Sequence, residues 1–159
     1  MNETIRWLHL TDLHVGMADQ DWLWPRMQIK FREDLKRIYD KADPWDLVLF
    51  TGDLVQKGTE YARLDEILDE IWGWFGEMGC DPKLLTVPGN HDLEWRNPKQ
   101  SSVKLLEQWA QDPDVPEGFW NEAEGEYRQV IDEALANYSK WWKDTPPEAE
   151  QRASWTTPG

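Results

Sequence analysis

Apolar residues in the first ninety-five positions follow two periodicities. Short apolar runs predict three strands, over residues 5–10, 46–50 and 83–87. Between them, apolar residues recur every three or four positions over 27–42 and 61–75, which predicts two amphipathic helices, the second with Thr59 as N-cap. The order strand, helix, strand, helix, strand is typical of α/β proteins with a parallel sheet. The LVLF run predicts a middle strand buried on both faces.

The pattern changes after Arg96. Apolar spacing predicts a short helix over 103–110 and a longer one over 127–141, separated by the turn-rich segment QDPDVPEG. No further strand is predicted. We therefore expect one domain over residues 1–145, with a core over 5–95 and a helical insertion over 100–142. Residues 146–159 are polar and carry prolines, as expected of a linker or a truncated end.

Composition narrows the class of protein. The chain has 159 residues, the size of one domain, and 40% hydrophobic residues, as globular proteins do. No apolar run approaches the ~20 residues that cross a bilayer, and the start lacks the basic and apolar regions of a signal peptide. Cys80 is the single cysteine, so no intramolecular disulfide forms. We expect no membrane partner and a cytoplasmic location.

The chain is strongly acidic, with a formal net charge of -14. Such a charge repels a polyanion at long range unless a basic patch or bound cations reverse the local field. Nucleic acid therefore stays open as a partner but is not favoured. The 12 tryptophans indicate an aromatic core and a buried contact surface rather than a ligand-stacking platform.

Polar clusters follow each predicted strand: Asp12-Leu13-His14, Gly52-Asp53 and Gly89-Asn90-His91-Asp92. Ligands of open parallel sheets bind beyond the carboxyl ends of the strands, so the three clusters should meet at one sheet edge. Gly52 and Gly89 allow a sharp turn and a close backbone approach there.

The residue types of these clusters suit divalent metals. Asp12 and His14 are two residues apart, so on an extended segment their side chains point the same way and can bind one ion. The two oxygens of Asp53 allow it to bridge two cations, and Asn90 offers a neutral oxygen to the second.

The motifs DLH, GD and GNHD resemble those of the calcineurin-like metallophosphoesterase superfamily. The resemblance implies a metallophosphoesterase-type sandwich (αββα), of which this chain would form the amino-terminal half with a parallel βαβαβ arrangement. It also implies a cofactor of two divalent metal ions, Mn, Fe, Zn, Mg or Ni. The substrate would be a phosphate ester, most consistent with a phosphodiester, attacked in line by metal-bridged water.

The resemblance assigns roles residue by residue. Asp12 and His14 would bind the first metal, Asp53 would bridge and Asn90 would bind the second. His91 would be catalytic, contacting the phosphate or protonating the leaving oxygen. Asp92 would orient His91 through a hydrogen bond.

Two later motifs of the superfamily, a lone histidine and Gly-His-x-His, have no counterpart. The chain's histidines are His9, His14 and His91, and we expect His9 to be packed and hydrogen-bonded within its strand. The sequence is therefore expected to be an amino-terminal fragment with weak or no activity, lacking carboxyl-terminal sequence or a fused domain. A fused domain is suggested by analogy alone, because the chain resembles bacterial phosphoesterase domains that are fused to nucleotide-binding modules. One sheet face would lack its partner sheet, and the Trp-rich helices after residue 100 would cover part of it.

The alternative function is a non-catalytic interaction module that retains the fold. The intact metal motifs argue against it, whereas the absent histidines and the aromatic carboxyl-terminal half argue for it.

Overall fold

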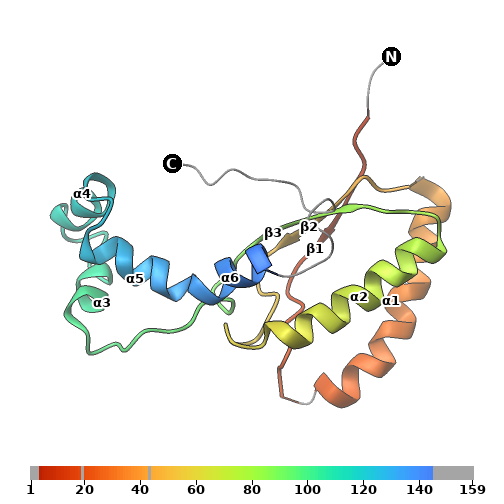
Figure 1. Cartoon of the computed structure of the whole chain (residues 1–159), viewed down its shortest axis with the longest axis horizontal. Coiled ribbons are helices and arrows are strands. Elements are labelled where there is room, and N and C mark those ends of the chain that lie inside the picture. The colour runs from red at the N-terminus through yellow and green to blue at the C-terminus, as the bar shows by residue number, and fades with distance from the viewer. Residues whose placement is uncertain (1–3, 19, 43, 145–159) are drawn as a thin grey trace.

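The computed structural model describes residues 4–18, 20–42 and 44–144, and these form one parallel three-stranded sheet with helices around it (Figure 1). The strands are β1 (Trp7–Leu10), β2 (Leu47–Thr51) and β3 (Lys83–Val87), in the order β1-β2-β3. The register pairs Leu8 with Val48 and Val48 with Leu84. The predicted α/β class, with its parallel βαβαβ arrangement and helical carboxyl-terminal segment, is confirmed. The predicted polar end, 146–159, lies outside the described residues.

Two long helices make the crossovers, and they lie side by side (Figure 1). They are α1 (Gln20–Ala42) and α2 (Tyr61–Glu77). Trp74 of α2 packs against α1, where it stacks on Trp24 and meets the Phe31 ring edge-on. The helix α1 begins seven residues earlier than the predicted 27–42 and contains Pro25 in its second turn. The missing N–H of Pro25 removes one helical hydrogen bond without ending the helix. The N-cap of α2 is Glu60, without a side-chain hydrogen bond, so the prediction of Thr59 was wrong.

The sheet is covered on one face. Val48, Phe50 and Leu84 point to the helices and are at most 2% exposed, whereas Trp7 and Val87 on the other face are 61% and 50% exposed. The prediction that β2 is buried on both faces was wrong, because α1 and α2 pack into the same hydrophobic core on the same side. His9 lies on the open face. It is hydrogen-bonded to the Thr51 hydroxyl at 2.6 Å, as expected, but it is exposed rather than packed.

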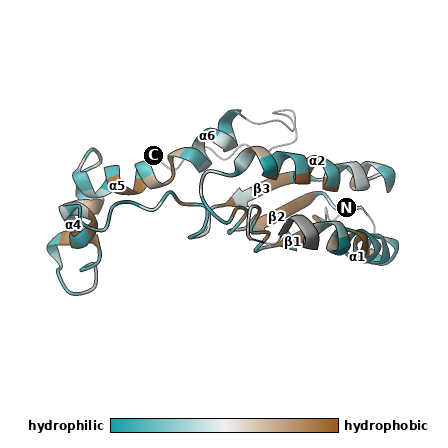
Figure 2. Ribbon diagram, turned by 90° about the horizontal axis from the view of Figure 1, so that it is seen from below, coloured by the Kyte–Doolittle hydropathy of each residue, from teal (hydrophilic) through white to brown (hydrophobic). Residues whose placement is uncertain are grey.

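Within residues 88–144, the described part that follows the sheet, the chain forms four helices: α3 (Ser101–Leu106), α4 (Asp114–Asn121), α5 (Glu126–Ala134) and α6 (Ala136–Asp144). The first three extend away from the sheet (Figures 1 and 2). The helix α4 occupies the segment predicted as a turn. Its prolines are Pro113 at the N-cap and Pro116 in the first turn, where a backbone N–H has no helical partner, so neither disrupts it. The predicted helix over 127–141 is two helices that meet at Leu135. Among the described residues, no helix has the length and apolarity to cross a membrane.

The last helix, α6, packs beside α2 (Figure 2). The Tyr138 hydroxyl lies 2.6 Å from the Thr86 hydroxyl and also donates to the Thr86 carbonyl at 3.0 Å. Trp141 is 4% exposed and stacks on Tyr61 with ring centroids 5.3 Å apart. The expectation that these helices cover the open sheet face was therefore wrong: Thr86 faces the core that α1 and α2 already cover, because it alternates with the exposed residues of β3.

This docking predicts that Tyr138→Phe weakens the fold. The substitution leaves the buried Thr86 hydroxyl and carbonyl without the Tyr138 donor, so we expect the free energy of unfolding to fall by ~1–3 kcal/mol. Urea unfolding monitored by tryptophan fluorescence measures it. The matched control is Tyr127→Phe in α5, where the Tyr127 ring packs near Gly118. Equal losses in the two variants would show that the Tyr138 hydroxyl does not hold α6 to β3.

Candidate metal centre

The segments after β1 and β2 run in parallel beyond the sheet. The backbone N–H of Asp12 donates to the Gly52 carbonyl at 3.2 Å, and that of His14 to the Asp53 carbonyl at 2.9 Å. Val15 and Val55 then form an isolated parallel bridge. The strand pairing thus continues into the loops, which brings the first two predicted clusters together.

The loop after β3 is joined to them by a buried carboxylate. Asp92 is 0% exposed, and its Oδ2 accepts the backbone N–H groups of Gly89 at 2.8 Å and Leu54 at 3.2 Å. Its Oδ1 accepts the N–H of Val55 at 3.0 Å. A buried carboxylate is strongly disfavoured unless it is hydrogen-bonded, so these three donors fix the two loops relative to one another.

Two glycines make the close approach of these loops sterically possible. Gly52 has a φ of 105°, and a Cβ on it would lie 2.9 Å from the Gly89 Cα. A Cβ on Gly89 would lie 2.6 Å from the Asp53 nitrogen and still closer to its carboxylate. The close backbone approach expected from the sequence is therefore present at both glycines.

Three predicted site residues converge where the loops meet. Donor atoms of His14, Asp53 and His91 all lie within 4.8 Å of one another, and all three residues are half-buried. The two imidazole rings meet edge to face, with centroids 4.7 Å apart. Metal ligands lie about 2.0–2.2 Å from their ion, so this spacing is close to that of ligands sharing one cation.

The backbone is strained at the same place. Among the described residues, the non-glycine residues with positive φ are Asp12 (57°), His14 (47°) and Asp53 (53°). Such conformations cost about 1–3 kcal/mol each and cluster at functional sites. The expectation that Asp12 and His14 lie on an extended segment was therefore wrong. Their side chains still meet, with Asp12 Oδ1 3.5 Å from His14 Nε2, because both residues turn in the left-handed conformation.

His91 is oriented by a different group from the one expected. Its Nδ1 lies 3.1 Å from the Gln56 carbonyl, which only accepts, so Nδ1 carries the proton and Nε2 is left for a ligand. Its backbone N–H donates to Asp53 Oδ1 at 2.9 Å. The predicted hydrogen bond from Asp92 to the ring was wrong, because backbone amides bind both oxygens of Asp92. No sequence signal marks Gln56, since every residue has a carbonyl.

The donors of the site fit a divalent metal. His14 Nδ1 is buried without a hydrogen-bond partner among the described residues, and two imidazoles with a carboxylate suit first-row transition metals. Asp12 is 59% exposed at the edge of the cluster. Asn90 lies in the same loop as His91 with an exposed side chain, outside the group formed by His14, Asp53 and His91. The structure thus groups three of the predicted residues, with Asp12 adjacent.

Tyr61 supports the site from α2, and the sequence pattern showed it only as a core position. It is 7% exposed, and its hydroxyl donates to the Asp92 carbonyl at 2.9 Å. Burial raises the pKa of the Tyr61 phenol far above its usual value, and the Asp92 and Tyr138 side chains raise it further. The hydroxyl therefore stays protonated and remains a donor.

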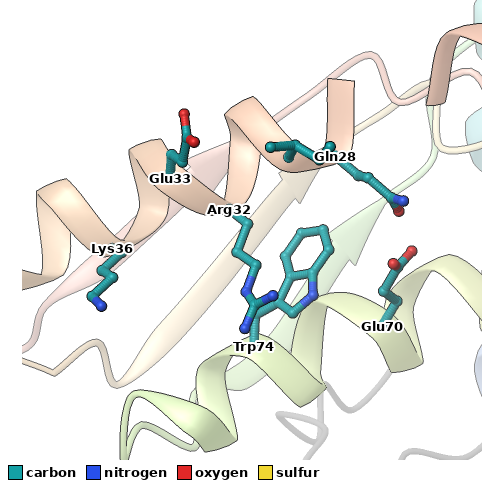
Figure 3. Close-up of a pocket in the computed structure, with 7 residues that line it drawn as sticks. Gln28, Arg32, Glu33, Lys36, Glu70 and Trp74 are labelled. Atoms are coloured by element: carbon teal, nitrogen blue, oxygen red, sulfur yellow. The ribbon is translucent and has the colours of Figure 1, made fainter. Parts of the chain in front are cut away.

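A separate groove of about 370 Å³ lies between α1 and α2 (Figure 3). Figure 3 shows the Arg32 side chain extending toward Trp74, with Glu70 at the far side. Arg32 also forms an ion pair with Glu77. None of the candidate metal ligands lines this groove, so it is distinct from the metal centre.

Sequence comparison with known proteins places the chain in a family of metal-dependent enzymes, which agrees with the candidate metal centre. The sequence model of calcineurin-like phosphoesterases matches residues 5–158, and the chain belongs to this family. It is 32% identical over 91 residues to the uncharacterized metallophosphoesterase-like protein YydB of Bacillus subtilis (strain 168), 56% of this chain and 18% of that protein. It is 29% identical over 93 residues to the 3',5'-cyclic adenosine monophosphate phosphodiesterase CpdA of Haemophilus influenzae, 57% of this chain and 31% of that one. The chain thus matches less than a third of each relative's length.

The glycine contacts predict opposite effects of two alanine substitutions. Gly89→Ala forces the Asp53 loop away, so we expect the free energy of unfolding to fall by about 1–3 kcal/mol. Gly73→Ala, within α2 and with nothing within 4 Å of the added carbon, should instead raise it by roughly 0.5–1 kcal/mol. Urea unfolding of both variants measures the difference. Stabilisation by Gly89→Ala would contradict the close contact.

The hydrogen bonds of Asp92 predict that Asp92→Asn is strongly destabilising. The amide turns one acceptor oxygen into a donor that faces backbone N–H groups, so we expect a loss of at least about 2 kcal/mol in the free energy of unfolding. Asp132→Asn, on the exposed surface of α5, makes the same change in charge and should have little effect. The role of Asp92 is disproved if the two variants unfold at the same urea concentration.

Proposed function

We propose that the chain carries the metal-binding part of a metal-dependent phosphoesterase, acting on a phosphodiester. The observation that supports this best is the convergence of His14, Asp53 and His91 at the carboxyl ends of parallel strands in a calcineurin-like phosphoesterase. Strain at Asp12, His14 and Asp53 supports it independently, because strained residues cluster where function requires a fixed geometry.

In this proposal, Asp12 and His14 would hold one divalent ion and Asn90 would help to hold a second, with Asp53 serving both. Divalent ions, Mn, Fe, Zn, Mg or Ni, would supply Lewis-acid activation of water and of the phosphate ester. The chain's own contribution is to hold these donors in place. The bond from the His91 N–H to Asp53 Oδ1 keeps that carboxylate turned toward the histidines.

His91 is the proposed catalytic residue. Because Nδ1 donates its proton to the Gln56 carbonyl, Nε2 is the ring nitrogen left for the substrate. In the doubly protonated imidazolium form, Nε2 can donate to the phosphate or transfer its proton to the leaving oxygen, with the Nδ1 bond unchanged. Asp92 acts as a positioning residue, because its contacts go to the loop backbone rather than to the ring.

A small phosphodiester is the proposed substrate. The relative from Haemophilus influenzae is named a cyclic adenosine monophosphate phosphodiesterase, which supports this class. The net charge of -14 makes nucleic acid the less favoured substrate, since a polyanion would be repelled at long range. The cytoplasmic location expected from the sequence stays a prediction.

The domain division is part of the proposal: a core over 5–95, a helical insertion over 100–142, and further metal ligands from sequence or a domain outside this chain. The chain's three histidines support it, since the two later motifs of the superfamily need more. Reading the coding DNA past Gly159 in the same frame tests it. A lone histidine followed by Gly-His-x-His is expected there.

Metal binding tests the function directly. We expect the chain to bind Mn²⁺ in calorimetric titrations, and Asp53→Asn to lower that affinity ~10–100-fold, because it removes a ligand charge. Asp69→Asn, on the exposed side of α2, makes the same charge change and should bind like the unmodified chain. We expect hydrolysis of bis(p-nitrophenyl) phosphate by this chain to be weak or absent, and any activity to be lost in His91→Ala and on adding EDTA. Failure of the unmodified chain to bind Mn²⁺ would refute the proposed site.

A non-catalytic interaction module is the second candidate. An exposed aromatic cluster favours it: Trp109 is 39% and Trp120 65% exposed, and both rings lie edge-on to Phe119. If a longer chain hydrolyses phosphodiesters and loses that activity when Asp53 or His91 is replaced, the enzyme is favoured over the interaction module.

A further inference from the structure

The two loops that carry Asp53 and His91 touch again at a second point, away from the ligands. Gly58 is buried, and a Cβ on it would lie 2.7 Å from the Asp92 carbonyl oxygen and 2.9 Å from the Glu94 nitrogen. The loop after β2 therefore lies directly on the backbone that follows His91. Any change at this contact alters the separation of the two loops.

One side chain from α6 bonds to both loops at this contact. The Asn137 amide nitrogen donates to the Gly58 carbonyl at 2.8 Å and to the Glu94 carboxylate at 3.2 Å. The Glu94 N–H in turn donates to the Ala134 carbonyl at 3.0 Å, at the end of α5. Asn137 is thus a bridge between the Asp53 loop and the His91 loop.

The helix that carries Asn137 is itself anchored in the core. Trp141 stacks on Tyr61 with an interplanar angle of 21°, and its indole N–H donates to Asp65 at 2.7 Å. Tyr138, one residue after Asn137, bonds to Thr86 in β3. Asn137 is therefore presented to the loops from a fixed position, and a fixed donor restrains loops better than a mobile one.

We propose that Asn137 is a positioning residue for the metal centre, holding the Asp53 loop and the His91 loop at the separation that lets Asp53 and Asn90 hold the same ion with His91 beside it. The inference rests on the proposed function and extends it. The helices after residue 100, expected from the sequence to be an insertion, then contribute to the site through α6. The contact between His91 N–H and Asp53 Oδ1 is the bond that this restraint protects.

The test is Asn137→Asp in the full chain. The substitution keeps the size of the side chain but turns its donor into an acceptor that faces the Gly58 carbonyl and the Glu94 carboxylate. Asn121→Asp, at the exposed end of α4, is the matched control. Asn137→Ala removes both bonds without adding charge, and it replaces Asn137→Asp if that variant does not fold.

The first readout needs no metal. We expect amide hydrogen exchange at His91 to rise at least about fivefold in Asn137→Asp relative to Asn121→Asp, with exchange at the buried Ile71 in α2 unchanged. The second readout is Mn²⁺ affinity, which should fall about tenfold.

The outcomes separate this inference from the proposed function. Unchanged exchange at His91, an equal rise at His91 and Ile71, or an Mn²⁺ affinity equal to that of Asn121→Asp would each overturn the positioning role. If the unmodified chain binds no Mn²⁺, the proposed function fails, and with it the role of Asn137 in a metal centre, whereas the exchange data still decide whether Asn137 restrains the loops.

Discussion

The geometry of the candidate metal centre depends on one buried carboxylate, that of Asp92. Asp92 is fully buried, and removing a charge from water is strongly unfavourable unless hydrogen bonds replace the lost hydration. Three backbone N–H groups from two loops supply those bonds, so the loops can separate only by leaving a buried charge unsatisfied. This constraint holds His91 against Asp53 and orders the candidate ligands.

The same constraint accounts for how the chain sustains strain at the site. The left-handed conformations of Asp12, His14 and Asp53 are individually unfavourable. They persist because backbone hydrogen bonds tie the two loops together, from the Asp12 N–H to the Gly52 carbonyl and from the His14 N–H to the Asp53 carbonyl. Gly52 and Gly89 contribute by having no side chain at the point of closest approach. Donors that are already oriented lose little conformational freedom when they bind a ligand, which is the advantage of a preorganised site.

The one-sided sheet decides how the rest of the chain takes part. Because α1 and α2 cover the same face, the core lies on that side, and α6 joins it there through Tyr138 and Trp141. Its position beside Tyr61 places Asn137 against the loops of the site. Asn137 follows Asp92, the end of the last metal motif, by 45 residues, and it contacts the same loops as the candidate metal ligands. The opposite face, with Trp7 and Val87 exposed, takes no part in these contacts.

The sequence alone determined the order and type of the five elements over residues 5–87 and the motifs that end the strands, because periodicity and turn residues act locally. It did not determine the covered sheet face, the helix α4 within a proline-bearing segment, or the partners of His91 and Asp92. Those depend on which backbone groups distant segments bring together, and every residue carries the same N–H and C=O. The Gln56 carbonyl orients His91 only because folding places it there. Local pattern thus indicated the candidate ligands, and tertiary packing specified how they are held.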